Sequence, residues 1–424
     1  MKYLIIPAIT ALTLMGCKSE THVSNEEKEE IAQDSTTTVE TAIGPLELVA
    51  PFSSESVRKN SKVVDWPQDM TPKAPEGFTV TRFADGLEHP RWTYVAPNND
   101  IFVSEANTGN GSKNQITLLR DTDNDGTVDE QHVYMTGLHQ NFGMLVLDGH
   151  FYVANTDGLY RYPYTEGANK NDAQGEKILD LPAGGYNNHW TRNIITNEAG
   201  DKIYISVGSA SNVGEHGLDT EKRRADILEV NPDGSGEVIY ASGLRNPVGM
   251  DWNPVNGELW TAVNERDELG NNLVPDYATS VKKGGFYGWP FSYYGQINDP
   301  RWNDDPHQGM VDKAIVPDVP LGPHTASLGF VFYDADQFPA EYNNGAFVGQ
   351  HGSWNREPFS GYKVVFIPFQ NGKPQPPQDF LTGFIKDEAS NEVYGRPVCT
   401  TIAPDGSLLV NDDDSGIIWK ITAN

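Results

Sequence analysis

His189 is the residue of this 424-residue chain best suited to proton transfer. It lies in the segment Gly184-Gly-Tyr-Asn-Asn-His-Trp-Thr-Arg192, directly before an expected strand. An unperturbed imidazole titrates at about pH 6.5 and can serve as a general base near neutrality. Arg192 follows three residues later, so the two side chains converge only across a turn. We expect His189 and Arg192 to be catalytic; the alternative for His189 is a structural role, bonded to a loop carbonyl.

Arginines recur at corresponding places along the chain. Arg245 and Asn246 precede the next strand of the same kind, while Arg396 and Arg91 hold the matching places near the end and the start. A guanidinium is a planar donor suited to carboxylates, and an amide both donates and accepts. On a chain of net charge −28, arginines gathered at one place predict a site for an anionic ligand. The alternative is that they pair with acidic neighbours between repeats.

Two acidic turns are candidates for Ca²⁺, which prefers oxygen ligands. The first is Asn264-Glu-Arg-Asp-Glu-Leu-Gly270, in which Asn264, Glu265 and Arg266 are the expected metal-binding positions. The second, Asp121-Thr-Asp-Asn-Asp-Gly126, resembles the start of a Ca²⁺ loop, but His132 stands where such a loop has its twelfth-position Glu. We interpret the second first as an ordinary turn between outer strands, with Ca²⁺ binding as the alternative.

The elements that must position these residues are repeated strands. A short β-branched or aromatic phrase recurs six times, as IFVSE at 101, FYVAN at 151, IYISV at 203, LWTAV at 259, AFVGQ at 346 and LLVND at 408. A period of about 50 residues or more with several strands per repeat is typical of a β-propeller. We therefore predict an all-β, six-bladed β-propeller of four-stranded antiparallel blades. The alternating segment 78–83 is expected to complete the last blade and close the ring.

The N-terminus predicts export and anchoring. Residues 1–16 have the form of a lipoprotein signal peptide, and Leu14-Met15-Gly16-Cys17 matches a lipobox that makes Cys17 the acylated first residue. Lys18 follows it; Asp at that place would retain a lipoprotein at the inner membrane. We expect the periplasmic face of the outer membrane, or the cell surface. An ordinary signal peptide with a chance Cys is the alternative. Residues 17–60, rich in Glu, Ser and Thr, predict a disordered acidic tether, which leaves 61–424 as the propeller domain.

Charge and cysteine content exclude several classes. With 59 acidic and 31 basic residues, the chain repels nucleic acid and anionic lipid headgroups, so the predicted membrane contact is the lipid anchor alone. If Cys17 is lipidated, Cys399 has no partner for a disulfide within the mature chain. No CxxCH motif for a c-type haem is present, and we find neither a P-loop nor a serine-hydrolase motif.

The motifs taken in order resemble the glucose/sorbosone dehydrogenase family, soluble β-propellers that use pyrroloquinoline quinone (PQQ), and in particular its sorbosone and aldose sugar dehydrogenase branch. The resemblance extends from about Gly77 to the C-terminus. It rests on HPRW at 89–92, HWTRN at 189–193, VGSASNVGE at 207–215, GLRNPVG at 243–249, NERDELG at 264–270, GGFYGWP at 284–290, HGSWNR at 351–356 and GRPV at 395–398.

By this resemblance His189 matches the family's base, which takes a proton from the sugar hydroxyl while hydride moves to the quinone. Arg245, Asn246 and Arg396 match residues that hold PQQ, and the backbone carbonyls of 264–266 match ligands of a Ca²⁺ ion that polarises the quinone. Two departures are visible. Asn188 replaces an Asp before the base, and the family's PQQ-contacting Lys has no clear counterpart, so Arg356 is the expected substitute.

The sequence thus predicts a PQQ- and Ca²⁺-dependent dehydrogenase that oxidises a sugar, such as an aldose at C1 or a sorbosone-like aldehyde, or a related alcohol. Electrons would pass to an external cytochrome or quinone, because the chain has no haem motif of its own. Two other functions fit the same fold. One is a Ca²⁺-dependent propeller lactonase or other hydrolase, against which the central arginines argue. The other is a non-catalytic propeller that binds a glycan or a protein.

Overall fold

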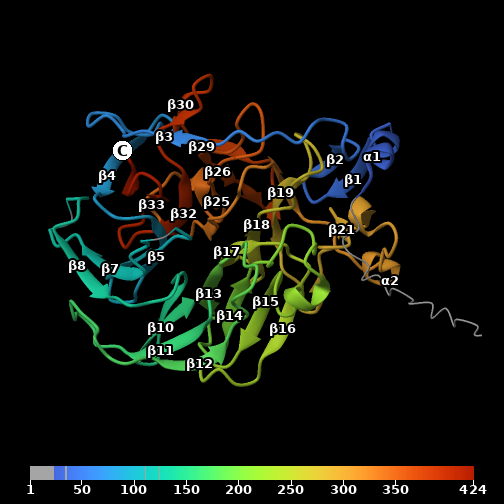
Figure 1. Cartoon of the computed structure of the whole chain (residues 1–424). Coiled ribbons are helices and arrows are strands. Elements are labelled where there is room, and N and C mark those ends of the chain that lie inside the picture. Colours follow the sequence, from blue (N-terminus) through green and yellow to red (C-terminus); the bar gives the residue numbers. More distant parts are fainter. Residues whose placement is uncertain (1–22, 34–35, 110, 124) are drawn as a thin grey trace, which may run out of the picture.

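Strands and short turns make up most of the molecule (Figure 1). The computed structural model describes residues 23–33, 36–109, 111–123 and 125–424. The helical elements are few and short: α1 (Asn25–Ile31), α2 (Gln308–Val311), and the 3-10 turns η1 (Leu218–Glu221), η2 (Pro300–Trp302) and η3 (Ala340–Tyr342). The predicted all-β class is confirmed.

In the described part of the chain, six sheets have four or more strands, and neighbours within them are antiparallel apart from β20. The first three are β5 (Pro90–Val95), β6 (Ile101–Glu105), β7 (Gln115–Arg120), β8 (Glu130–Met135); β9 (Met144–Leu147), β10 (His150–Asn155), β11 (Gly158–Pro163), β12 (Glu176–Asp180); and β13 (Arg192–Thr196), β14 (Ile203–Val207), β15 (Asp226–Val230), β16 (Val238–Ser242), with β20 (Gly285–Phe286) added in parallel. The other three are β17 (Pro247–Trp252), β18 (Leu259–Val263), β19 (Pro275–Ser280), β23 (Val319–Pro323); β24 (Val331–Phe332), β25 (Ala346–Gln350), β26 (Lys363–Ile367), β29 (Gln378–Leu381); and β32 (Pro397–Ile402), β33 (Leu408–Asp412), β34 (Ile417–Ala423), β4 (Phe78–Ala84).

The six copies of the repeated phrase all fall in second strands, namely β6, β10, β14, β18, β25 and β33. The sixth sheet joins the two ends of the chain, because β4 pairs with β34 along its length, for example Val80 with Ile421. The prediction that residues 78–83 complete the last repeat is therefore confirmed. Pairing the ends leaves no open sheet edge at the junction.

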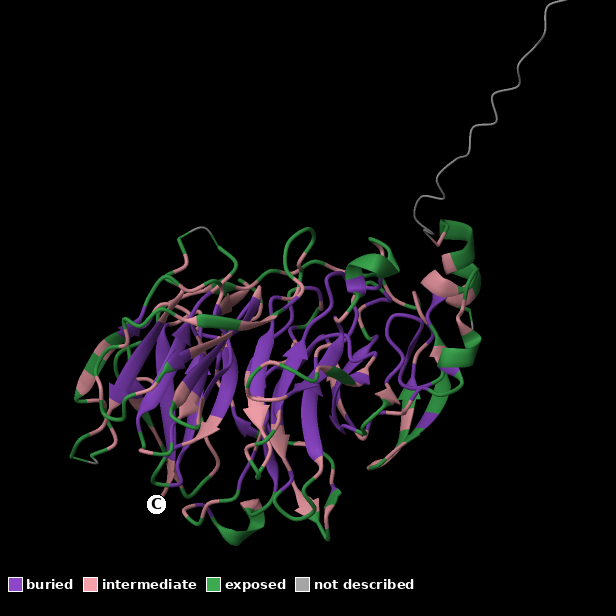
Figure 2. Cartoon of the chain, turned by 90° about the horizontal axis from the view of Figure 1, so that it is seen from below, coloured by how far each residue is buried: buried purple, intermediate pink, exposed green. Residues whose placement is uncertain are grey.

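The first strands of the sheets surround a common axis. Each touches the next in the order β5, β9, β13, β17, β24, β32 and back to β5. One buried side chain or pair per sheet fills the space between them: Trp92, Phe142, Trp190, Val248, Leu328, and Val398 with Cys399. Glycine is required where the strands meet most closely. A Cβ on Gly143 would lie 2.4 Å from the backbone nitrogen of Ile194, and one on Gly249 would lie 2.3 Å from that of Phe330. Figure 2 shows that most strands of the ring are largely buried, with exposed turns at both edges.

Residues 25–60 are not a disordered tether, and that prediction is wrong for the described residues. We call residues 23–64 the N-terminal arm; it contains α1, the hairpin β1 (Thr37–Thr41) with β2 (Gly44–Leu48), and β3 (Lys62–Val63). Val39 and Leu48 are buried in a core shared with Leu269 and Tyr277. The composition has few apolar residues, but they alternate along the hairpin and so face the ring together. The arm then crosses the ring toward β4 (Figure 1).

Smaller sheets of two or three strands lie outside the six larger sheets. They are β21 (Ser292–Tyr293) with β22 (Ile297–Asn298), β27 (Phe369–Gln370) with β28 (Lys373–Pro374), and the arm's β3 with β31 (Glu392–Val393) and β30 (Ile385–Asp387). In the described residues we find no helix with the length and apolar character needed to cross a bilayer. The predicted signal peptide and the lipidation site Cys17 lie outside the described residues, so both stay predictions.

Candidate active site

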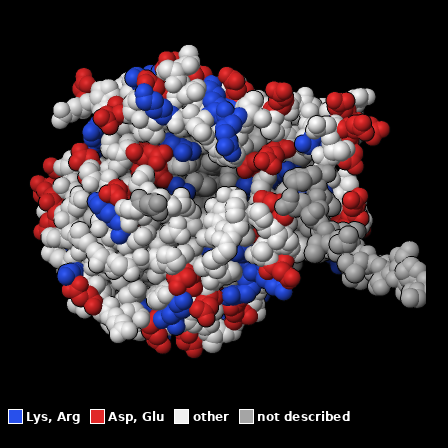
Figure 3. All heavy atoms as spheres, viewed as in Figure 1, with Lys and Arg blue, Asp and Glu red and all other residues white. Residues whose placement is uncertain are grey.

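The predicted site residues gather at one edge of the ring because of strand pairing. In the three sheets concerned, the start of the first strand lies opposite the end of the second: Arg192 faces Val207, Pro247 faces Val263, and Pro397 faces Asp412. Segments just before a first strand and just after a second strand therefore share this edge, which we call the mouth. Figure 3 shows a hollow near the centre of the face, with basic and acidic side chains around it.

His189 is held as a neutral imidazole in which Nε2 can accept a proton. Its Nδ1 lies 3.0 Å from the carbonyl oxygen of Ser209 and 2.9 Å from Ser209 Oγ, which itself donates to the carbonyl of Ser211. A carbonyl only accepts, so these partners place the proton on Nδ1 and leave Nε2 as the acceptor. Burial and the charge of Arg245 lower the pKa of His189 to about 3. The ring can therefore accept a proton at Nε2 over the neutral pH range.

Asn246 lies against this histidine. A Cβ added to Gly208 would be 2.3 Å from Asn246 Oδ1 and 2.6 Å from His189 Cβ, so the two side chains meet across a glycine that has no room for one of its own. Asn246 is buried, and its Oδ1 has no hydrogen-bond partner among the described residues. A buried acceptor without a partner costs free energy, so a donor group of a ligand would satisfy this oxygen. Asn188 is exposed, with its Nδ2 3.5 Å from His189 Nε2.

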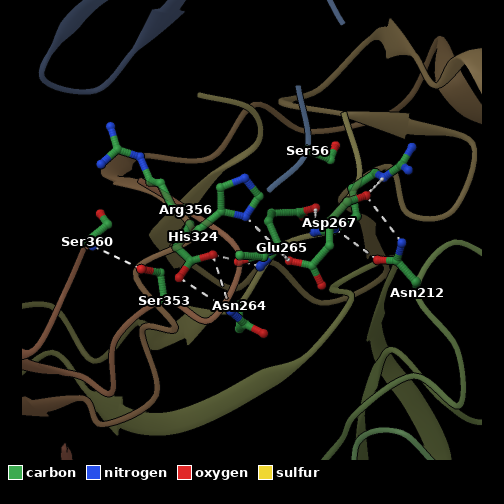
Figure 4. A network of polar contacts seen from close by, with 12 residues as sticks. Ser56, Asn212, Asn264, Glu265, Asp267, His324, Ser353, Arg356 and Ser360 are labelled. Carbon is green, nitrogen blue, oxygen red and sulfur yellow. Dashed lines mark hydrogen bonds and ion pairs between the residues drawn. The ribbon is translucent and has the colours of Figure 1, made fainter. Parts of the chain in front are cut away.

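Arg245 is buried and donates to two loops at once. Its Nε and Nη2 reach the carbonyl and the side chain of Asn212, at 3.0 and 2.9 Å. Its Nη1 reaches the carbonyl of Glu265 at 2.5 Å and that of Asn264 at 3.2 Å, and Nη2 lies 3.0 Å from Asp267 Oδ2. Figure 4 shows this network, with Asp267 between Asn212 and His324. One guanidinium thus ties the loop after β14 to the loop after β18.

Asp267 is the anionic centre of this network. Burial opposes its ionisation, but Arg245 and His324 hold its pKa well below the usual range. The Nδ1 of His324 lies 3.4 Å from Asp267 Oδ1, and Asn355 donates to the same oxygen at 2.7 Å. Burial would lower the pKa of His324, and the neighbouring carboxylate raises it instead. Asp267 and His324 were missed as site residues, although Asp267 lies inside the turn singled out for metal binding.

The turn 264–266 does not present a Ca²⁺ site in the predicted form. The carbonyls of Asn264 and Glu265 accept hydrogen bonds from the Arg245 guanidinium, itself a cation. The Arg266 side chain binds Asp299 at 2.7 Å, and the Glu265 carboxyl accepts from the backbone of Arg266. Burial raises the pKa of Glu265 to about 7. A Ca²⁺ ion at these carbonyls would have to displace Arg245.

The second predicted Ca²⁺ turn lies far along the chain from the mouth loops, between β7 and β8. Asp121, Asp123 and Asp129 place carboxylate oxygens within 4.8 Å of one another there. Asp129 was missed, although it stands at the ninth position of the loop, which often supplies a Ca²⁺ ligand. The proposed Ca²⁺ binding of this turn stays a prediction.

Arg396 and Arg91 border the opposite side of the mouth. Arg396 donates to the carbonyls of His351 and Gly352 at 3.0 and 2.9 Å, and its Nη1 lies 3.5 Å from Asp414. Arg91 pairs with Asp413 at 2.5 Å, and His351 Nε2 lies 2.7 Å from the same carboxylate. The alternative interpretation, pairing with acidic neighbours, therefore holds for Arg91. The acidic run 412–414 could have been found in the sequence, since it lies at the end of a repeated strand, close to where the turn 264–270 lies in its own repeat.

Arg192 does not face the mouth as expected. Arg192 is fully buried, and its guanidinium donates to the carbonyls of Thr156, Thr191 and Pro182. Burial lowers its pKa to about 9. Its hydrogen bonds fasten the segments around 156, 182 and 191 to one another in the interior, and it cannot reach a ligand. Its assignment as catalytic is therefore wrong. Arg356 donates hydrogen bonds to the carbonyls of Asn271 and Pro358 and to the side chain of Asn272.

A family model described as TrAA12-like matches residues 72–283 and 300–424. The chain belongs to the TrAA12-like family. The relatives of this TrAA12-like protein include a PQQ-dependent sugar dehydrogenase of Hypocrea jecorina, 22% identical with 88% of this chain and 94% of the relative covered. An uncharacterized protein of Borreliella burgdorferi is 28% identical, and the match covers 83% of this chain and 90% of that protein. A PQQ-dependent pyranose dehydrogenase of Coprinopsis cinerea is 34% identical over 81% of this chain, which spans only 54% of that relative.

Solved structures agree with the fold of this TrAA12-like protein. A structure of Trichoderma reesei Carbohydrate-Active Enzymes Family AA12 matches with a TM-score of 0.70, at 20% identity and with 86% of this chain and 100% of that chain covered. The PQQ domain of pyranose dehydrogenase from Coprinopsis cinerea matches with a TM-score of 0.68, at 21% identity and with the same coverage. At these identities the likeness establishes the fold alone.

The buried position of Arg192 predicts a role in stability. Replacing Arg192 with Met should lower the free energy of unfolding by about 3 kcal/mol or more, because three buried carbonyls lose their donors at about 1 kcal/mol or more each. Urea denaturation followed by tryptophan fluorescence measures this. The control Lys222→Met removes an exposed cation paired with exposed Asp219 and should change stability by less than about 0.5 kcal/mol. Equal stability of the Arg192 variant and wild type would contradict the structural role.

Proposed function

We propose that this protein is a PQQ-dependent dehydrogenase that oxidises a sugar or a related alcohol. The observation that carries the proposal is the pairing of a neutral His189, with Nε2 as acceptor, and the partnerless Asn246 Oδ1 across Gly208. Both lie at a mouth bordered by arginines. The relatives that bear a sugar or pyranose dehydrogenase name support the same function.

We further infer that the six larger sheets are the blades of a six-bladed propeller. Each has four antiparallel strands in chain order, except that β4 supplies the outermost strand of the last and β20 extends the third. The closed order of first strands around one axis supports this interpretation. A propeller gathers its loops at one mouth, so residues more than 200 positions apart can form one site.

The residues present fit a tricarboxylate quinone in part. Asn246 offers a buried acceptor that has no partner among the described residues, and the charge of Arg396 is little compensated because its closest partners are neutral carbonyls. We propose that PQQ is held by Arg245, Asn246 and Arg396, with Arg356 and Asn188 at the rim. Bound there, PQQ would supply the two-electron acceptor that oxidation of an alcohol requires.

His189 would act on the substrate as general base. Its Nε2 would take the hydroxyl proton of the sugar, while the Nδ1–H bond to Ser209 keeps the ring oriented and fixes the tautomer. The pKa of about 3 means that the ring is already unprotonated at neutral pH, although it is also a weak base. The Ser209 carbonyl would favour the imidazolium once it forms, because Nδ1–H then donates more strongly. We propose an external cytochrome or quinone as the electron acceptor.

The central experiment uses the full chain with His189→Gln and the control His139→Gln, whose side chain is exposed. PQQ binding is followed by quinone absorbance, and turnover with a panel of aldoses and an artificial acceptor. Wild type and His139→Gln should bind PQQ and bleach it with a sugar. His189→Gln should bind PQQ but lose turnover by a factor of about 10²–10⁴, the range for a general base.

Normal turnover by the His189 variant would contradict the mechanism. If wild type binds no PQQ, turnover of a lactone without quinone would favour the hydrolase, and binding of a glycan alone would favour the non-catalytic propeller. The protonation state is checked by NMR of the imidazole from pH 8 to pH 5. Its signals should remain those of a neutral ring, since the pKa lies at about 3.

We propose Ca²⁺ only as a ligand that competes with Arg245 for the carbonyls of Asn264 and Glu265. One related structure is named a calcium structure of Trichoderma reesei family AA12. Ca²⁺ alone should therefore change the Tm of the protein by less than about 1 °C, since binding that is weak at the working concentration stabilises little. Ca²⁺ with PQQ should raise it more than either alone, because an anionic cofactor gives Arg245 another partner. Differential scanning fluorimetry with Mg²⁺ as control measures this in an Asp121→Asn, Asp123→Asn variant, which removes two carboxylates of the other candidate turn. A large shift with Ca²⁺ alone in that variant would contradict the competition.

We also propose that the mature chain begins at Cys17 and is held at the outer membrane or cell surface by its lipid. The lipobox 14–17 and the acidic composition, which disfavours direct contact with anionic headgroups, support this. Cys17→Ser should move the protein from the membrane fraction to the soluble fraction on expression in a diderm bacterium. Cys399→Ser is the matched control and should remain with the membranes. Mass spectrometry showing no acyl group on Cys17 of wild type would refute the anchor.

A further inference from the structure

The N-terminal arm is fastened to the loop that carries Asp267. The backbone nitrogen of Phe52 donates to the carbonyl of Leu269 at 2.8 Å. Ser54 Oγ accepts from Asn271 at 3.0 Å, and Ser56 Oγ accepts from Gly270 at 3.2 Å. Gly270 has no room for a side chain, because a Cβ there would lie 2.7 Å from the carbonyl oxygen of Ser54. The arm and the loop after β18 therefore form one packed unit, and Ser56 lies near His324 and Asp267 (Figure 4).

A cavity of about 650 Å³ lies between the arm and the mouth loops. Nine of its thirteen lining residues belong to the arm, and the other four are Val213, Arg266, Glu268 and Arg301. This volume is within the range of about 300–1,000 Å³ that is usual for small-molecule sites. The cavity exists only because the arm covers this side of the ring.

The cavity shares a wall with the candidate active site. Val213 follows Asn212, which accepts two hydrogen bonds from Arg245. Arg266 and Glu268 flank Asp267, the ion-pair partner of Arg245. A ligand in the cavity would therefore touch residues next in the chain to those that organise the mouth.

The lining suits a neutral ligand with many hydroxyls. It offers carboxylates from Glu29, Glu55 and Glu268 and cations from Lys28, Arg266 and Arg301, so neither charge predominates. A hydroxyl both donates and accepts, and charged partners give it stronger hydrogen bonds than neutral ones. Phe52 adds an aromatic ring, with Lys28 Nζ 5.5 Å from its centroid.

We propose that this cavity binds the non-reacting part of an oligosaccharide, so that the arm selects substrates longer than one sugar ring. The inference rests on the proposed function for its reaction, but the binding of a saccharide is separable from catalysis. The reacting ring lies at the mouth beside His189, and the following rings extend under the arm. Substrate length is then set by Phe52 and the arm's carboxylates rather than by the propeller.

The test compares two double variants of the full chain. Glu29→Ala with Glu55→Ala removes two carboxylates from the cavity, while Glu26→Ala with Glu40→Ala removes two exposed arm carboxylates outside it. Binding of glucose, cellobiose, maltose and their trisaccharides to the PQQ-free protein is measured by saturation-transfer NMR and calorimetry. The Kd for the preferred di- or trisaccharide should rise about tenfold or more in the cavity variant, as expected for lost hydrogen bonds to charged groups. It should not change in the control.

Activity supplies a second readout. With PQQ present, the ratio of kcat/KM for the preferred oligosaccharide to that for its monosaccharide should fall in the cavity variant and stay constant in the control. Unchanged binding and an unchanged ratio would overturn the proposal, as would wild type that binds no oligosaccharide more tightly than a monosaccharide. The protein could also bind an oligosaccharide, lose that binding only in the cavity variant, and oxidise no sugar. This result would support the subsite and refute the proposed dehydrogenase. A thermal melt confirms that both variants are folded.

Discussion

The guanidinium of Arg245 is the interaction on which the mouth depends. It lies at the start of the fourth sheet, yet its donors reach the loop after β14 at Asn212 and the loop after β18 at Glu265 and Asp267. Asp267 in turn pairs with His324. The same loop is hydrogen-bonded to the N-terminal arm at Leu269 and Gly270. The positive charge also helps to keep His189 neutral. Removing the partner of a buried cation costs free energy, because the charge is left uncompensated. Arg245 therefore holds these loops in one fixed arrangement.

The sequence predicts the scaffold well because the repeat acts through backbone pairing. A phrase of β-branched and aromatic residues fits a strand that is buried on both faces, and each of the six copies is found in a second strand. Gly143 and Gly249 lie at corresponding places in two repeats, where the inner strands approach too closely for a Cβ. Closure by β4 follows from the need to pair the strand edge at the C-terminus. These are local rules that act similarly in every repeat.

The site is less predictable because it depends on the direction of single side chains. His189 and Arg192 are three residues apart, but the chain turns into β13 between them, so one faces the mouth and the other the interior. The turn 264–266 has the oxygen atoms expected of a cation site, and a guanidinium from another loop uses two of them. The arm looked disordered by composition, although five apolar residues pack it against an existing core: Val39, Leu46, Leu48, Val49 and Phe52. Each error concerns a contact between segments distant in sequence.

The charges at the mouth explain how an acidic protein could still receive an anionic ligand. Arg91, Arg245 and Arg396 pair with three carboxylates, Asp413, Asp267 and Asp414, so the local balance among these groups is neutral. Attraction by net charge is therefore weak, and screening at physiological salt weakens it further. What distinguishes Arg396 and Arg356 is that their closest partners are neutral oxygens, which orient a guanidinium without cancelling its charge. Affinity for an anion then depends on oriented donors and on the buried acceptor of Asn246, so the mouth favours a ligand of matching shape over anions in general.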